Sequence, residues 1–294
     1  MEKRREEREA AALRVSGISI AANLALSAFK LSAGLIGHST ALISDAVHSA
    51  SDVFSTIIVI IGVKLSGREA DREHPYGHER FESLASLFLA FVLGVTGLSI
   101  GVNSAQQIHS GEYGVTAFPG MLALAAALIS IAVKEWLFQY TKRVSVKTGS
   151  SVLMADAWHH RSDALSSIGS FAGILGARLG FPVCDSLAGI IICVFILKTA
   201  LDIFRDSSGK LTDRSCDPET LSGMDRLIRE QPGVKNLDLL QTRQFGSGIF
   251  VDIEISADAD LPLREAHEIA ETVDRRIEEQ FKNVKHCMVH VNPA

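Results

Sequence analysis

The chain has 294 residues, 47% of them apolar, and a formal net charge of -5. This length allows one large domain or two modest ones. The net charge says little, because a mostly apolar part from about Val15 to Phe204 precedes a tail with the charge density of a soluble domain. We expect no nucleic-acid partner. The four cysteines form no C-x-x-C pair, and we interpret all of them as structural.

Six apolar segments are long enough to cross a bilayer core of about 30 Å at about 1.5 Å per residue. They run over Val15–Ile36, Thr40–Leu65, Phe81–Ile108, Phe118–Tyr140, Val152–Leu179 and Val183–Phe204. The first is too long for a signal peptide and lacks a small-residue cleavage site, so we expect no cleaved leader. The charged segment 1–14 before it has the composition of a frayed, solvated helix.

Lysine and arginine gather in alternate connections, which sets the expected orientation in the membrane. Lys3, Arg4, Arg5, Arg8 and Arg14 precede the first span. The connection between the second and third spans is flanked by Lys64, Arg68, Arg72 and Arg80, and that between the fourth and fifth by Lys134, Lys142, Arg143 and Lys147. The other connections carry almost none. We therefore expect a multi-pass protein of the inner (plasma) membrane with both termini in the cytoplasm.

Two copies of the pattern D-A-x-H-x-x-x-D lie inside the second and fifth spans. They read DAVHSASD (Asp45–Asp52) and DAWHHRSD (Asp156–Asp163). Because the second and fifth spans are three apart in sequence order, the copies run in opposite directions across the membrane, as in the inverted repeats of transporters. Both histidines are about nine residues from a span end, and hence ~14 Å deep.

The two octets predict a metal site. Residues four apart share one helical face, so the octets supply two imidazoles and two carboxylates, a four-coordinate set that suits Zn²⁺ or a related divalent ion. The set is His48, Asp52, His159 and Asp163. Interhelical hydrogen bonds alone are the alternative, but two copies at one depth favour a site. Asp45 and Asp156 either orient the histidines or line an access path, and the sequence does not separate these roles.

The tail has the pattern of a small α/β domain. Apolar positions at helical period mark Pro218–Glu230 and Leu263–Phe281, and alternating Val, Ile and Phe mark strands at Val234–Gln244, Gly248–Ser256 and Val284–Val291. The order α-β-β-α-β is typical of a ferredoxin-like domain. The predicted fold class is an α-helical membrane protein with six transmembrane helices, followed by a cytoplasmic ferredoxin-like domain.

Several motifs together resemble the cation diffusion facilitator family over nearly the whole chain. They are the octets, ADREHPYGHERFES, KEWLFQYTKRV, ADAWHHRSDALSS, LLQTRQFG, EAHEIAE and VHVNP. The resemblance implies a homodimeric exporter of divalent transition metal in a lipid bilayer, driven by proton exchange. It divides the chain into a charged segment 1–14, a transport domain 15–205 and a metal-binding and dimerisation domain 206–294.

The resemblance also implies further metal positions. Asp71, His74 and His78 match a cytoplasmic loop site, although a hydrated loop with incidental histidines is the alternative. The tail-site positions are Asp238, Glu254, His267, His290 and Asn292. Three of these, Asp238, Glu254 and Asn292, are usually rich in histidine, so we expect a weak or altered tail site. Arg80 and Asp213 match a charge pair that joins the membrane and tail parts.

The function predicted from these features is export of Zn²⁺, or of Co²⁺, Cd²⁺ or Fe²⁺, from the cytoplasm by alternating access in exchange for protons. The metal is both the transported substrate and a possible regulator. The alternatives are a manganese or iron exporter of the same family and a non-transporting membrane metal sensor or scaffold. The chain has no H-E-x-x-H, nucleophile elbow or phosphate loop, so we do not expect an enzyme.

Overall fold

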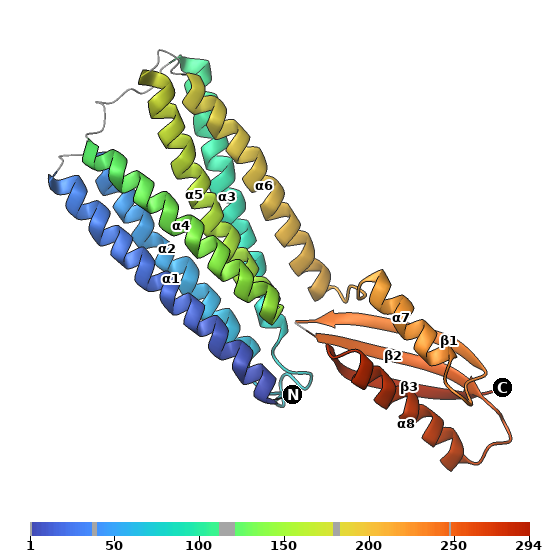
Figure 1. Ribbon diagram of the computed structural model, residues 1–294. Coiled ribbons are helices and arrows are strands. Elements are labelled where there is room, and N and C mark those ends of the chain that lie inside the picture. Colours follow the sequence, from blue (N-terminus) through green and yellow to red (C-terminus); the bar gives the residue numbers. More distant parts are fainter. Residues whose placement is uncertain (1, 37–39, 112–120, 179–182, 247) are drawn as a thin grey trace. The chain divides into compact units, whose positions relative to one another are not determined.

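A computed structural model describes residues 2–36, 40–111, 121–178, 183–246 and 248–294 of the chain. The chain divides into two units, Met1–Ser207 and Ser208–Ala294. Each unit has a hydrophobic core of its own. The elements of each unit are labelled in Figure 1.

The helices of the first unit are long and follow the six apolar segments. They are α1 (Glu2–Ile36), α2 (Thr40–Ser66), α3 (Arg80–Ser110), α4 (Met121–Thr148), α5 (Ser151–Arg178) and α6 (Val183–Leu211). Several of them extend beyond the apolar segment, most clearly α1 into the charged start and α4 through Thr148. Apolarity therefore marks the part of each helix that suits lipid, while the helix itself continues into polar sequence.

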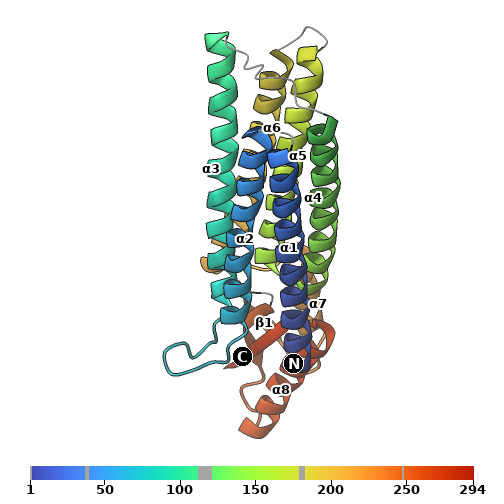
Figure 2. The ribbon, with the colours of Figure 1, turned by 90° about the vertical axis from the view of Figure 1, so that its left-hand side faces the viewer.

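Helix packing places α2 and α5 at the centre of this unit. The α1 helix packs along α2, α4 packs along α5, and α3 contacts both α2 and α5. Figure 2 shows α1 and α2 side by side. Buried aliphatic residues from several helices form the core, among them Val15, Val59, Leu93, Val152 and Ile196. The two helices that carry the octets therefore contact each other and also pack against α1, α3 and α4.

Large apolar side chains also cover the outside of these helices. Phe54, Phe91, Ile191 and Val194 are each more than 60% exposed. Within the described residues, two helices are apolar enough over a sufficient length to cross a membrane, Glu7–Ser32 within α1 and Arg80–Ser110. An apolar outer surface on a bundle of long helices is what a lipid environment requires.

Glycine allows α3 and α6 to approach closely. A Cβ atom added at Gly97 of α3 would lie 2.7 Å from a side-chain carbon of Ile196, and one at Gly101 would collide with the sulfur of Cys193. On the facing helix, a Cβ at Gly189 would collide with the hydroxyl of Ser104. Small residues at such crossings let two backbones approach in a membrane, where dispersion contacts drive helix association.

The second unit has the predicted α-β-β-α-β order. Its elements are α7 (Pro218–Arg229), β1 (Asn236–Phe245), β2 (Gly248–Ala257), α8 (Leu263–Gln280) and β3 (Val284–Pro293). Asp217 caps α7 by accepting a hydrogen bond from the Thr220 backbone N–H (2.9 Å), and Pro218 stands at the start of the helix, where a missing N–H costs nothing.

The three strands form a sheet with both helices on one face. The order is β1-β2-β3, with β1 and β2 antiparallel and β2 and β3 parallel. Val251, Ile253 and Ile255 point into the core with Met224 of α7 and Val273 of α8. Because side chains alternate along a strand, Glu254 and Ser256 point to the face without helices. Of the tail positions predicted to bind metal, Asp238, Glu254 and Asn292 gather on that face, whereas His267 lies on α8.

Candidate metal centres

The octet side chains that the structure describes lie together between α2 and α5. Asp52 comes from α2, whereas His159 and Asp163 come from α5 and, four residues apart, share a helical face. One ligand atom from each lies within 4.8 Å of the others, and the His159 Nε2 atom is 3.6 Å from Asp52 Oδ1. All three residues are at most 6% exposed. A buried set of two carboxylates and an imidazole is a plausible ligand set for a divalent metal ion.

The remaining octet positions have different outcomes. The side chains of His48 and Asp45 fall outside the described part of the structure, so the fourth ligand stays a prediction. Asp156 is fully buried, and its carboxylate lies 3.6 Å from Nε2 of His160, which also lies 3.2 Å from the Ser19 hydroxyl. Asp156 thus approaches His160, the residue next to the expected ligand His159.

A lysine completes the buried cluster, and the sequence interpretation missed it. Lys134 of α4 is 2% exposed, and its ammonium group donates hydrogen bonds to Asp52 Oδ2 and, at 2.9 Å, to Asp163 Oδ2. The sequence prediction that Lys134 flanks the connection between the fourth and fifth spans is wrong, because the residue is buried in the middle of α4 (Met121–Thr148). The signal was in the sequence: an ionisable residue inside an apolar span is a functional candidate by default.

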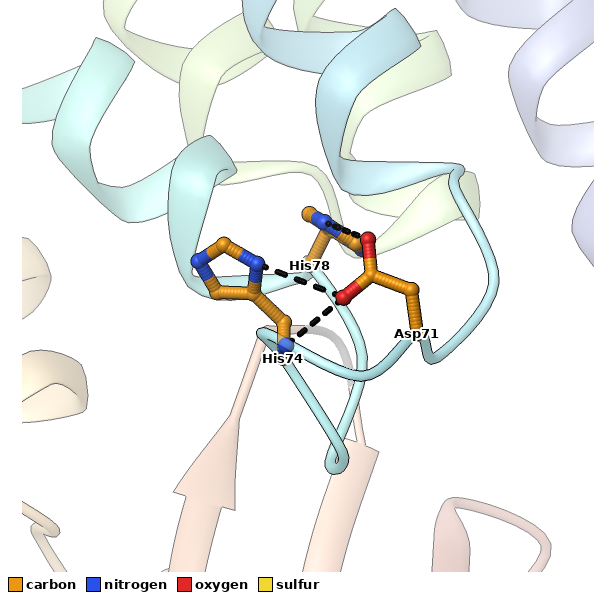
Figure 3. Close-up of side chains that lie close together, drawn as sticks. All are labelled: Asp71, His74 and His78. Carbon is orange, nitrogen blue, oxygen red and sulfur yellow. Dashed lines mark hydrogen bonds and ion pairs between the residues drawn. The ribbon is translucent and has the colours of Figure 1, made fainter.

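The loop between α2 and α3 brings its three predicted residues together (Figure 3). His78 Nε2 lies 3.4 Å from Asp71 Oδ2, and His74 Nδ1 lies 3.6 Å from Asp71 Oδ1. The two imidazole centroids are 4.4 Å apart. Unlike the buried cluster, this group is partly open to solvent, with Asp71 about half exposed.

Backbone hydrogen bonds preorganise this loop cluster. The Asp71 carboxylate accepts the backbone N–H of His74 at 2.7 Å and that of Glu73 at 2.9 Å, and these bonds lower the pKa of Asp71. The Nδ1 atom of His78 lies 3.0 Å from the Glu69 carbonyl, which accepts a hydrogen bond from the protonated Nδ1. This bond leaves the Nε2 lone pair facing Asp71, the arrangement that a metal-binding histidine needs.

The tail positions form a hydrogen-bonded group on the open face of the sheet. Asp238 stands at a bulge in β1, and its carboxylate accepts hydrogen bonds from Ser256 Oγ (2.5 Å) and Asn292 Nδ2 (3.2 Å). The first of these bonds is the main cause of a lowered pKa for Asp238. Asn292 Nδ2 also lies 3.5 Å from Glu254 Oε2. The amide nitrogen of Asn292 therefore faces both carboxylates.

The two tail histidines do not join that group through any described contact. His267 lies on α8 and faces Glu271, with 3.3 Å between Nε2 and a carboxylate oxygen. His290 pairs with Glu254 in the register of β2 and β3, but it is exposed. Arg80 begins α3 in the first unit, whereas Asp213 lies in the second unit with a φ of 58°. The charge pair between Arg80 and Asp213 stays a prediction.

Comparison with known families decides what kind of protein this is. Residues 16–212 match the cation efflux transmembrane domain, and residues 216–294 match the cation efflux protein cytoplasmic domain. The chain belongs to the cation efflux family. The resemblance to cation diffusion facilitators and the predicted fold class are thereby confirmed. This cation efflux protein is a membrane transporter of metal cations and not an enzyme.

Two curated relatives of this cation efflux protein are named for manganese efflux, and a third is named for metal tolerance without a particular metal. Manganese efflux system protein MneS of Bacillus subtilis is 36% identical over 94% of this chain and 93% of its own length. Manganese efflux system protein MneP of the same organism is 31% identical, with 98% of both chains covered. Metal tolerance protein C1 of Arabidopsis thaliana is 35% identical over 94% of this chain, which spans 61% of that protein's length.

Proposed function

We propose that this cation efflux protein exports a divalent first-row metal ion from the cytoplasm in exchange for protons. The observation that carries the proposal is the buried cluster of Asp52, His159 and Asp163. Buried carboxylates inside a membrane are costly unless a cation or proton compensates them. With His48 as the fourth ligand, the two octets provide a site between α2 and α5 that can open to either side by alternating access.

Zinc is our first candidate for the transported ion, because two imidazoles with two carboxylates form a common zinc ligand set. Manganese is the second candidate, and two observations favour it. MneS and MneP are both named for manganese efflux. In addition, two of the three described ligands are carboxylates, and oxygen donors suit Mn²⁺. Measuring the uptake of each ion into vesicles separates the two candidates.

Proton exchange follows from the ligand chemistry. A histidine that binds metal must be neutral, and an imidazole in water has a pKa of about 6.5. Protonation therefore competes with metal, and metal affinity should fall about tenfold as the pH drops from about 7.5 to about 6. The direction follows because protons accumulate on the free ligands as the pH falls, which opposes metal binding.

Purified protein in sealed vesicles tests this proposal. An imposed proton gradient should drive Zn²⁺ or Mn²⁺ against its own gradient, and a proton ionophore should stop this uphill movement. Transport that ignores both would rule out exchange and leave a facilitated pathway. A protein that moves no divalent ion would be better described as a membrane metal sensor or scaffold.

We further propose a homodimer in the plasma membrane with both termini in the cytoplasm. Residues 15–205 would form the transport domain and residues 206–294 the dimerisation domain. The exposed Lys147 and Arg143, with the half-buried Lys142, still support this orientation after Lys134 is removed from the charges considered. Cross-linking in membranes tests the dimer, and cysteine labelling from either side of sealed vesicles tests the orientation.

A further inference from the structure

Lys134 bonds to one oxygen of each carboxylate in the proposed transport site. Its ammonium group bonds to the Oδ2 atoms of Asp52 and Asp163, one carboxylate from each octet. It reaches them from α4, a helix that packs along α5 and contacts α1. The α4 helix lies outside the repeated pair of motifs, so this contact is not part of the octet pattern.

Electrostatics explains why a cation lies there. Asp52 and Asp163 are 3% and 6% exposed, and two carboxylates with ligand atoms within 4.8 Å repel strongly where water is excluded. Each buried charge also loses its hydration, a cost of several kcal/mol per ion in proteins. One ammonium between the two carboxylates offsets part of both costs. Asp52, Lys134 and Asp163 thus form one group of three charges joined by hydrogen bonds.

A metal ion and this ammonium group exclude each other. Metal-bound carboxylate oxygens lie about 2.0–2.2 Å from zinc, whereas the ammonium nitrogen already lies 2.9 Å from Asp163 Oδ2 and bonds to Asp52 through the equivalent atom. Two cations sharing these oxygens would repel at short range. Lys134 must therefore leave the two Oδ2 atoms before the transported ion can bind through them, and an ion held by the Oδ1 atoms would still be repelled by the nearby ammonium group.

We propose that Lys134 is an internal cation that competes with the transported metal for Asp52 and Asp163. The inference rests on the proposed function and names a further residue that sets the affinity of the proposed transport site for metal. When metal enters, the ammonium group leaves; when metal departs, it returns and replaces one of the two lost positive charges. This competition weakens metal binding, which an exporter needs for release, and spares the empty carrier two uncompensated buried carboxylates.

Three variants of α4 test the competition. Lys134→Met removes the charge and keeps an unbranched side chain, and Lys134→Arg keeps the charge on a planar group that binds carboxylates in a fork. Lys147→Met removes an exposed lysine from the same helix and serves as the matched control. Calorimetry on the full-length protein in detergent measures the Kd for Zn²⁺ and Mn²⁺. Only the binding that Asp163→Ala abolishes is assigned to the buried site.

The affinity for metal should be highest with Met at position 134, intermediate with Lys and lowest with Arg. Lys134→Met should bind about tenfold more tightly than the parent protein, because the metal no longer displaces a cation. Lys147→Met should bind like the parent. A residue that merely held helices together would give the opposite result, with weaker binding on its removal. An unchanged or weaker Kd for Lys134→Met would overturn the inference.

Two further outcomes keep the inference separate from the proposed function. If Lys134→Met does not give a monodisperse protein, Lys134→Arg decides: weaker metal binding supports competition, and unchanged or tighter binding overturns it. Vesicle transport is measured on the parent protein alone. A parent that transports metal with the wrong order of affinities refutes only the role of Lys134, whereas a parent that transports none refutes the proposed function.

Discussion

Two acidic groups in this cation efflux protein contain similar side chains in different surroundings. In the helical unit, Asp52 and Asp163 are almost fully buried and share the ammonium group of Lys134. In the tail, Asp238 and Glu254 lie on an open sheet face and share the neutral amide of Asn292. Water screens and solvates the tail group, so neutral hydrogen-bond donors suffice there. The buried group needs a full positive charge.

This difference indicates which group gains more from a divalent cation. Where water is excluded, the attraction between the ion and its ligands is strong, and the ion also replaces costly bare charges. On the sheet face, an ion would have to replace water and three protein hydrogen bonds to Asp238. Its attraction to the carboxylates would also be weaker there, because water screens them. We therefore expect substitutions to have effects that decrease from the buried site to the tail.

The largest effect is expected at the buried carboxylates. Asp163→Ala or Asp52→Ala removes one ligand and one of two balancing charges, so metal uptake into vesicles should fall to the level of empty vesicles. Asp202→Ala, which changes an exposed carboxylate of α6, should retain the parent rate. Size-exclusion chromatography should give the same profile for all these proteins. Parent-like transport by either buried variant would show that the site is assigned wrongly.

A smaller effect is expected from exchanging one donor. His48→Asp replaces a nitrogen ligand by a harder oxygen, so the ratio of zinc to manganese transport should fall, by about tenfold if His48 binds the ion directly. Competition between the two ions for vesicle uptake measures this ratio. If the ranking of ions stays unchanged, selectivity is determined elsewhere, for example by the movement that opens the site.

The loop cluster should affect the supply of metal more than its transport. Asp71→Ala removes the acceptor of the His74 and Glu73 backbone N–H groups and separates the two histidines from their shared carboxylate. The KM for metal should rise about two- to fivefold with little change in the maximal rate. Glu73→Ala, at an exposed neighbouring position, is the control. Equal kinetics for both variants would show that the loop cluster takes no part in metal transport.

The smallest effect is expected in the tail. Asp238→Ala should change the maximal transport rate by less than about twofold, because its carboxylate is held by Ser256, Asn292 and Asn236 rather than poised for metal. The separate hydrophobic core of this unit supports testing residues 206–294 alone, which should dimerise. Tight zinc binding by this fragment, near nanomolar or about -12 kcal/mol, would contradict the expected weakness.

The sequence predicted the fold well because its helical part follows from the length of apolar segments and its tail from simple periodicity. The strand at Gly248 and the helix starting at Leu263 begin where the pattern places them. Helix ends were less predictable, because hydropathy records where lipid lies and not where backbone hydrogen bonding stops. The error at Lys134 has a different cause, because this residue lies well inside the predicted span Phe118–Tyr140 and only its charge suggested a place beside the connection.

Which residues pair inside the bundle could be predicted only where a motif repeats. The matching octets gave the pairing of Asp52 with His159 and Asp163, because identical spacing on two helices implies one shared location. Nothing in the sequence linked Lys134 to them, since that contact depends on the helix pairing and on rotamers. Likewise, the approach of Asp156 to His160 follows from the i, i+4 geometry of α5, but adjacent histidines left the partner ambiguous.

The glycine contacts between α3 and α6 have a mechanical consequence. With backbones this close at Gly101 and Gly189, neither helix can slide past the other without steric overlap. We therefore expect α3 and α6 to keep their relative position at this crossing when access to the buried site changes. An alanine at Gly101 would replace none of the proposed metal ligands. Its methyl group would push α3 and α6 apart, and the variant would therefore test helix packing separately from metal binding.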